Sequence, residues 1–165
     1  MRMFPRGSGG GPVRASVEHH KGDALYLMRW NSGCWTVGEE GGRGVGAKDV
    51  ATVVAFNEAI NARNLDALGQ LMHDRHRFID SAGATIQGKA ACLEAWRGFF
   101  DAFPDYRNVF DDIRSEAAGV VAVRGRSECS ATPVLDGPAR WLALVEDGLI
   151  LQWQVSEVGE HDLEP

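Results

Sequence analysis

One carboxylate in an apolar frame is the side chain of this sequence best placed to do chemistry. Asp80 follows Phe78 and Ile79, and the turn-forming residues 81–83 come directly after it. An acid at the end of an apolar strand costs free energy unless a partner or a ligand uses its charge. In an apolar pocket such an acid can be a general acid or base, whereas in a turn it accepts backbone hydrogen bonds. Both roles are open for Asp80, and the apolar residues before it favour the pocket.

Two histidines form a weaker candidate site. His73 and His76 are three residues apart, with Asp74 beside them, where a helix is expected to give way to a strand. A zinc site in a protein normally has at least three protein ligands, and no third ligand follows from the sequence. We therefore expect solvated histidines at a helix end and no metal.

The composition excludes several classes of function. A chain of 165 residues with a formal charge of −6 is expected to be one domain that does not bind nucleic acid, since phosphate contacts require a basic face. No apolar run is long enough to span a membrane, and the first residues lack the apolar segment of a signal peptide. The three cysteines have no paired spacing, which predicts reduced thiols and a cytoplasmic protein; Cys92 and Cys129 are expected to be buried.

The chain divides into two segments of unlike composition. Residues 1–48 hold seven Lys/Arg and four Asp/Glu, a net of +3, whereas residues 49–165 hold ten and nineteen, a net of −9. Eleven of the twenty glycines lie in the first segment, where ordering the backbone is costly. We expect residues 1–48 to be a largely disordered leader, with a short strand or helical turn at 25–30. Two alternatives stand equal: a genuine flexible tail, or a mis-assigned start with translation beginning near Val45.

The second segment, residues 49–165, shows helical patterns first and strand patterns afterwards. Apolar residues recur at helical spacing from Val50 to Ile60, Asn64 is placed to cap a second helix, and Gly88 opens a third that Pro104 ends. This order indicates an α+β domain with three helices packed on a mostly antiparallel sheet. Strands are expected at 77–80, 84–87, 106–115, 119–130, 139–146 and 149–158, the last two joined by the hairpin signal Asp147-Gly148.

Three blocks of sequence carry a resemblance to a known family. They are residues 55–68, residues 78–83 with Gly88, and the later landmarks 103–105 and 145–153. In order and spacing the chain resembles the nuclear transport factor 2-like superfamily, and within it the SnoaL-like polyketide cyclase and ketosteroid isomerase group. The resemblance implies a cone in which a curved sheet wraps the helices around an apolar cavity. It also implies a homodimer and a small, apolar organic ligand. Because this fold serves many functions, the site must be argued residue by residue.

The resemblance assigns Asp80 the position of the isomerase general base, but its partners differ. The tyrosine and the protonated aspartate that complete the isomerase oxyanion hole are matched here by Phe56 and Trp141. The acid that follows a tryptophan on the last cyclase strand is matched by Gln154, after Trp153. Phenylalanine donates no hydrogen bond and glutamine exchanges no proton at neutral pH. Gln154 points either into the cavity or, with Gln152 and Ser156, to the outside.

The expected site is therefore a lone acid in an aromatic pocket. Asp80 is the catalytic candidate, and Phe56, Trp96, Phe100, Trp141 and Gln154 are the candidate substrate-binding residues, with no metal or organic cofactor. The chemistry would be isomerisation, cyclisation or dehydration by proton transfer next to a carbonyl. The alternative is a non-catalytic ligand-binding or dimerisation module, which the missing partners favour.

A strand with alternating charges supports a third, weaker alternative. Arg124, Arg126 and Glu128 share one face by their spacing of two residues. With Asp80, Arg126 and Glu128 could activate water as in limonene epoxide hydrolase, so that epoxide or ester hydrolysis is conceivable. A solvated or dimer-facing charged strand is the favoured interpretation, because Val121 and Val123 occupy the opposite face.

Overall fold

The computed structural model describes residues 17–21, 24–31, 34–36 and 45–157. Within the expected leader, three strands form an antiparallel sheet of their own: β1 (Val17–Lys21), β2 (Ala24–Asn31) and β3 (Cys34–Thr36). Of the two structures expected for residues 25–30, the strand is the one present. Residues 1–16, 22–23, 32–33 and 37–44 of the expected leader lie outside the described residues, so the disorder expected for them and the alternative start stay predictions.

Helix α1 (Val45–Asn61) begins four residues before the expected domain boundary. It buries Val53, Phe56 and Ile60 completely, as their helical spacing predicts. Its first turns are tied to the sheet by Asp49, whose Oδ2 accepts a hydrogen bond from the Gly119 amide at 2.9 Å. This contact sets the position of α1, and with it the position of Phe56.

The second and third helices begin where the sequence predicts. α2 (Leu65–Leu71) is capped by Asn64, whose Oδ1 accepts from the Ala67 amide at 3.0 Å. α3 (Lys89–Ala102) follows Gly88, which has a positive φ of 93° that suits glycine. Pro104 comes two residues after the end of α3 and cannot continue the helical hydrogen bonding.

The six-stranded sheet has the order β5-β4-β9-β8-β7-β6 and is mixed. β4 (Met72–Ile79) and β9 (Leu149–Glu157) run parallel, whereas the other neighbours pair antiparallel: β5 (Thr85–Gln87), β6 (Arg107–Ala117), β7 (Val120–Glu128) and β8 (Gly137–Glu146). A short 3₁₀ helix, η1 (Pro133–Leu135), precedes β8. The expected hairpin joins β8 to β9, with positive φ values at Asp147 and Gly148.

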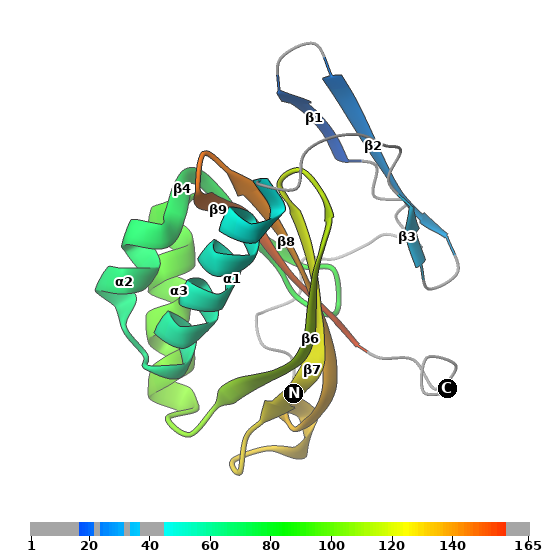
Figure 1. The fold of residues 1–165 in the computed structure, drawn as a ribbon. Coiled ribbons are helices and arrows are strands. Elements are labelled where there is room, and N and C mark those ends of the chain that lie inside the picture. The colour runs from blue at the N-terminus through cyan, green and yellow to red at the C-terminus, as the bar shows by residue number, and fades with distance from the viewer. Residues whose placement is uncertain (1–16, 22–23, 32–33, 37–44, 158–165) are drawn as a thin grey trace.

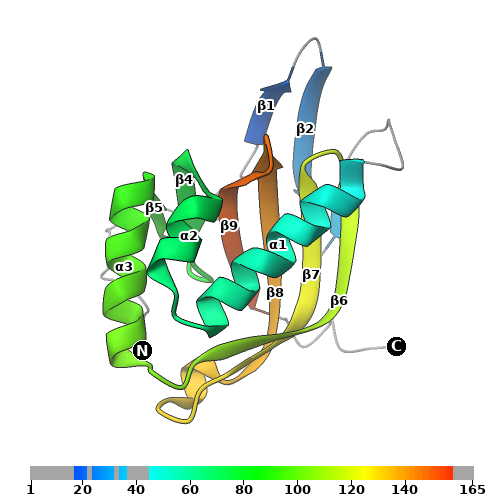
Figure 2. The ribbon, with the colours of Figure 1, turned by 60° about the vertical axis from the view of Figure 1, so that its left-hand side comes forward.

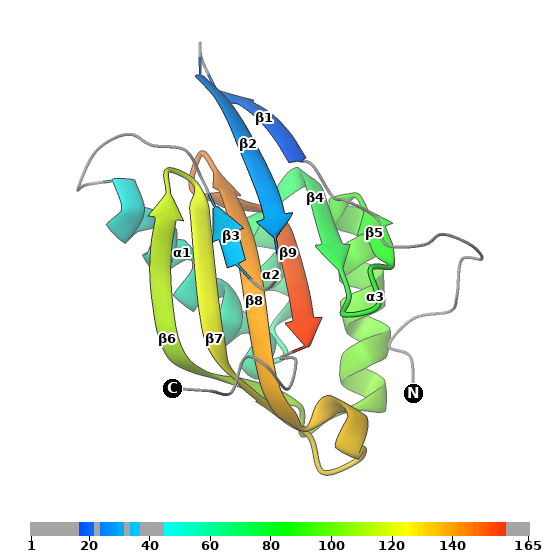
Figure 3. The same cartoon turned by 90° about the vertical axis from the view of Figure 1, so that its right-hand side faces the viewer.

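The helices cover one face of this sheet (Figures 1 and 3). β6 passes the C-terminal end of α1 and then runs along that helix (Figure 2). The main core lies between the helices and this inner face, to which β8 contributes Trp141, Ala143 and Val145. Leu142 and Leu144 point to the outer face, where they form a second cluster with Val120. The α+β class, with three helices and a mostly antiparallel sheet, is confirmed.

Cys92 and Cys129 are buried, as expected. Burial raises the pKa of the Cys92 thiol to about 11, so this group stays protonated at neutral pH. A buried neutral thiol behaves as a small apolar side chain.

Candidate functional site

Asp80 follows β4 directly and is 6% exposed. Its Oδ1 accepts hydrogen bonds from the amides of Ala82 at 2.9 Å and Ala84 at 2.8 Å. The backbone closes the same turn, because the Gly83 amide donates to the Asp80 carbonyl and the Asp80 amide donates to the Ala84 carbonyl. One oxygen of this carboxylate is therefore committed to the turn, which is the structural role that the sequence left open.

Phe56 on α1 is fully buried in the main core. Its ring centroid is 5.8 Å from that of His76 on β4 and 5.2 Å from that of Trp153 on β9. Phe56, which matches the isomerase tyrosine in sequence, is thus an apolar ring in contact with two nitrogen-bearing rings. Phe56 can supply apolar contact area to a ligand but no hydrogen bond.

His76 corrects a prediction, because it is neither solvated nor at a helix end. It lies in β4 and is completely buried. α2 ends at Leu71, and residues 72–76 join the strand because β4 pairs with β9 from the far end of the chain. Such long-range pairing is invisible to a local sequence pattern. His73, three residues earlier, is half-buried and lies 3.9 Å from a carboxylate oxygen of Glu146.

The ring of His76 has one partnered and one unpartnered nitrogen. Nδ1 lies 2.8 Å from the carbonyl oxygen of Ile150. A carbonyl only accepts, so Nδ1 carries the proton of the neutral ring. Burial lowers the pKa of His76 to about 4, with a smaller contribution from the charge of His73. The imidazole is therefore neutral at pH 7, and Nε2 presents a lone pair that has no partner within the described chain.

Two indole N–H groups on the inner face of the sheet also lack hydrogen-bond partners among the described residues. Trp141 on β8 and Trp153 on β9 are 2% and 0% exposed, and neither Nε1 has an acceptor among the residues described. Phe110 on β6 packs against both, with centroid distances of 5.2 Å to Trp141 and 6.4 Å to Trp153. Buried polar groups are normally hydrogen-bonded, so two such donors around one ring require an explanation.

Trp96 and Phe100 form a separate aromatic group on α3. Their rings stack at a centroid distance of 5.4 Å, and Trp96 also contacts Phe78 on β4 edge-on at 5.6 Å. Both are buried in the main core. They belong to the same core as Phe56 and Trp141.

Gln154 lies on the outer face of the sheet, away from Trp153. Its register partner on β8 is Leu142, a member of the outer cluster. Gln152 donates from Nε2 to the Gln154 Oε1 at 3.1 Å and accepts from the Arg77 Nε at 2.6 Å. Of the two orientations considered for Gln154, the structure has the outward one, so this side chain does not share the interior with the other candidates.

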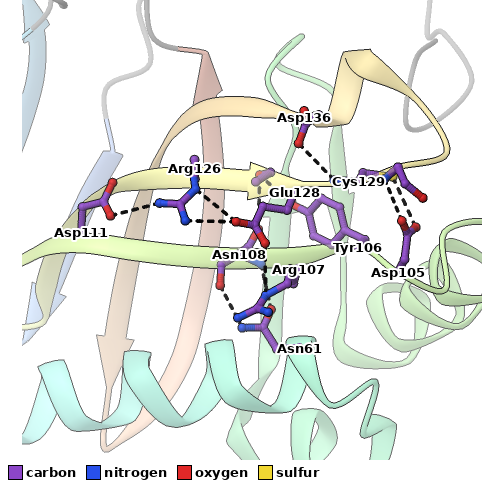
Figure 4. A network of polar contacts seen from close by, with 12 residues as sticks. Asn61, Asp105, Tyr106, Arg107, Asn108, Asp111, Arg126, Glu128, Cys129 and Asp136 are labelled. Carbon is purple, nitrogen blue, oxygen red and sulfur yellow. Dashed lines mark hydrogen bonds and ion pairs between the residues drawn. The ribbon is translucent and has the colours of Figure 1, made fainter.

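The charged side chains of β7 also point to the outer face of the sheet. Arg126 contacts Glu128 at 3.0 Å and Asp111 at 3.5 Å, and its side chain is about half exposed (Figure 4). It lies on the face opposite Val121 and Val123, which are in the main core. Arg126 and Glu128 are engaged with each other at the surface, which removes the geometric basis for the hydrolase alternative.

A buried polar network fixes the start of β6 against α1 (Figure 4). The Asn61 side chain makes two hydrogen bonds with the backbone of Asn108, one to its carbonyl at 2.9 Å and one from its amide at 2.8 Å. The Tyr106 hydroxyl lies 3.1 Å from the Ser127 hydroxyl, which in turn donates to the Asn108 Oδ1. Burial raises the pKa of Tyr106 to about 12, so this phenol stays neutral and structural.

No three His, Cys, Asp or Glu side chains of the described residues gather in a geometry that could hold a metal ion. The helices described also include none with the length and apolar character that crossing a membrane requires.

The residue that sequence reasoning missed is His76. The signal was present, since His76, Phe78 and Asp80 follow the two-residue period of a strand with one buried face. This strand pattern is easily overlooked, because the second helix is expected to extend to His76.

A sequence model of the SnoaL-like domain matches residues 53–153. No curated protein matches the sequence. A candidate polyketide cyclase from Sinorhizobium meliloti has a similar structure, with a TM-score of 0.58 and 20% identity over 64% of this chain and 94% of that one.

Two further solved structures are similar. A candidate ketosteroid isomerase from Kribbella flavida has a TM-score of 0.58 at 17% identity, covering 73% of this chain and 90% of that one. A protein from Catenulispora acidiphila with a ketosteroid isomerase-like fold, in complex with trimethylamine, has a TM-score of 0.55 at 18% identity, covering 64% and 84%. At such identities the likeness concerns the fold.

Proposed function

The chain belongs to the family of SnoaL-like domains, and on this basis we propose that it binds a small, largely apolar organic molecule with a carbonyl group. The binding place is the interior between the helices and the inner face of the sheet. Phe56, Trp96 and Phe100 supply apolar contact there, and the indoles of Trp141 and Trp153 supply the polar contacts. The complex of a similar fold with trimethylamine supports a small organic ligand.

The observation that carries this proposal is the pair of unpartnered indole N–H groups. Trp141 and Trp153 each bury a donor that has no acceptor in the part of the chain that the structure describes. A carbonyl oxygen has two lone pairs and can accept from both. Each hydrogen bond gained would contribute about 0.5–1.5 kcal/mol net, because the ligand carbonyl gives up its hydrogen bonds to water.

Phe110 is the residue that a ligand would have to displace to reach these donors. It is only half-buried, whereas the two indoles that it contacts are almost fully buried. The pairing of β6 with β7 also shifts register between Phe110 and Asp112, which interrupts the regular ladder beside this ring. A ligand would displace the Phe110 ring and occupy its place against the indoles.

Two ligands that differ in one group test this proposal. 2-Acetylnaphthalene and 2-isopropenylnaphthalene have nearly the same shape, but only the first has a carbonyl oxygen. We expect the full chain to bind the ketone about tenfold more tightly, which corresponds to about 1.4 kcal/mol. Trp153→Phe and Trp141→Phe should each reduce this ratio, measured by calorimetry.

Trp96→Phe is the matched control for this experiment. It removes the same atoms from the same core, but its indole nitrogen is not among the unpartnered donors. The ratio of the two affinities should therefore stay at the wild-type value. Equal binding of both compounds to the wild type would refute the carbonyl contact.

Proton transfer by Asp80, as in an isomerase or cyclase, is the second candidate function. The burial of Asp80 favours it, and the commitment of Oδ1 to the turn opposes it. Binding without catalysis is the function that the geometry supports better. The homodimer and the cytoplasmic location remain predictions, and sedimentation of the full chain would test the first of these.

A further inference from the structure

The Nε2 atom of His76 is a second kind of unpartnered group in the interior. The two indoles are donors, whereas this nitrogen is an acceptor, because Nδ1 holds the ring proton in its bond to Ile150. His76 is fully buried, with 0% relative exposure. Nothing in the carbonyl contact proposed above uses His76.

The ring that carries this acceptor and one of the two donor-bearing indoles contact the same phenyl ring. Phe56 contacts both His76 and Trp153, so one ring connects the acceptor to one of the two donors. Trp153 is also the register partner of Phe78, two residues along β4 from His76 on the same face. A ligand bound at Trp153 is therefore separated from the His76 ring by the single ring of Phe56.

A second acceptor lies on the helix side. The Oδ1 atom of Asn57, which follows Phe56 on α1, is buried and has no partner in the described chain. Asn57 itself is 8% exposed. Adjacent residues of a helix project in different directions, so Asn57 and His76 are two separate buried acceptors.

We propose that His76 accepts a hydrogen bond at Nε2 from a hydroxyl group of the ligand, so that this domain selects hydroxy-carbonyl compounds over simple ketones. The inference rests on the proposed function and names the substrate class of the same site. The hydroxyl proton stays on the ligand, and the imidazole acts as a neutral acceptor. His76 on β4, and not Asp80 directly after this strand, is then the polar residue that the ligand contacts.

The test uses acetylnaphthalenes that carry either a hydroxyl or a methyl group at position 5, 6 or 7. Hydroxyl and methyl are similar in size, so the ratio of their affinities isolates the hydrogen bond. For at least one position we expect the wild type to prefer the hydroxyl compound by about tenfold. His76→Asn should lower that ratio severalfold, because asparagine can keep the donor to Ile150 but has no atom at Nε2.

His73→Asn is the matched control, since His73 is on the same strand but partly exposed, beside Glu146. The ratio of its affinities for the hydroxyl and methyl compounds should equal that of the wild type. An independent readout comes from nitrogen-15 NMR, in which the Nε2 signal of His76 should shift when the hydroxyl compound binds and not when the methyl compound binds. A structural role of His76 alone would leave that signal unchanged.

The outcomes separate this inference from the proposed function. Indole N–H signals of Trp141 and Trp153 that shift with every ketone, together with an unchanged Nε2 signal, would overturn the role of His76 and keep the carbonyl contact. If no compound shifts either set of signals, both proposals fail. A lowered ratio in His76→Asn with an unchanged Nε2 signal in the wild type would also overturn the direct contact.

Discussion

The Nδ1 atom of His76 on β4 donates a hydrogen bond to the carbonyl oxygen of Ile150 on β9, at 2.8 Å. This bond joins the two parallel strands where their register shifts, between the pairs Met72–Ile150 and Arg77–Gln152. It also fixes the tautomer, and so determines that the other ring nitrogen is an acceptor. One contact thus links the pairing of β4 to the polarity of the interior.

The first prediction concerns the pH dependence of stability. His76 has a pKa of about 4 in the folded protein against 6.5 for an ordinary histidine, because it is buried. The unfolded chain therefore binds more protons between these values, and the free energy of unfolding should fall as the pH drops from 6.5 to 4. The loss should be about 3 kcal/mol, since one pKa unit corresponds to about 1.4 kcal/mol.

Urea denaturation at a series of pH values would measure this loss. His76→Asn removes the titrating group, so the variant should be less stable at pH 7 but should lose less stability on acidification. His73→Asn, on the same strand, serves as the control and should keep most of the wild-type pH dependence. The groups near His76 that also titrate are His73 and, at high pH only, the Cys92 thiol. Parallel curves for His76→Asn and the wild type would contradict the assignment.

The second prediction concerns the contact between α1 and β6. Asn61 pairs with both backbone groups of Asn108, which is 2% exposed. Asn61→Ala would leave a buried amide and a buried carbonyl without partners, at a cost of about 2–3 kcal/mol. Thr52→Ala, which removes an exposed hydroxyl on the same helix, should change stability by less than about 0.5 kcal/mol. Equal thermal midpoints for the two variants would show that the Asn61 contact contributes little.

Local patterns predict the helices of this domain because their ends depend on nearby residues. The Asn64 cap, Gly88 and Pro104 each act within a few residues of a helix end, and all three predictions are confirmed. The beginning of β4 could not be predicted in this way. Residues 72–76 belong to a strand because β4 pairs with β9, more than seventy residues later, at Met72 and again from Arg77 onward. Their local spacing resembles the end of a helix.

The same limit explains the orientation of β9. Alternation correctly separates Gln154 from Trp153, but it does not tell which of the two faces inward. Strict alternation places Leu151 on the face of Trp153, yet Leu151 packs in the outer cluster. The pairing of β8 with β9 shifts between Leu144 and Val145, and this irregularity breaks the two-residue period at Leu151. A bulge depends on both strands and is not encoded in either pattern alone.

The third prediction compares two glycines. A Cβ atom on Gly125 of β7 would lie 2.0 Å from the backbone oxygen of Val109 on β6. Gly125 is also the register partner of Phe110, so this close approach positions the ring that covers the indoles. Gly125→Ala should destabilise the domain by more than about 3 kcal/mol, because backbone atoms must move. The measurement is the free energy of unfolding in urea.

Gly98 provides the contrasting case. It lies inside α3, and a Cβ atom there meets nothing within 4 Å. Gly98→Ala should stabilise the domain by about 0.5–1 kcal/mol, since alanine loses less backbone entropy in a helix. If the two substitutions had similar effects, the close approach of β6 and β7 would not be the reason for a glycine at position 125.

The last prediction separates the two roles of Asp80. Asp80→Ala removes the acceptor of the Ala82 and Ala84 amides and should cost about 1–2 kcal/mol of stability, as the loss of a comparable helix cap does. Asp80→Asn keeps an oxygen at this position and should stay within about 0.5 kcal/mol of the wild type. If Asp80 only closes the turn, Asp80→Asn should also bind 2-acetylnaphthalene with unchanged affinity. The acetyl protons of this ligand should then exchange with deuterium at the same rate in the presence of the variant and of the wild type. If the wild type catalyses this exchange and Asp80→Asn abolishes it while the fold and the affinity are retained, then Asp80 is a general base and the domain is an enzyme.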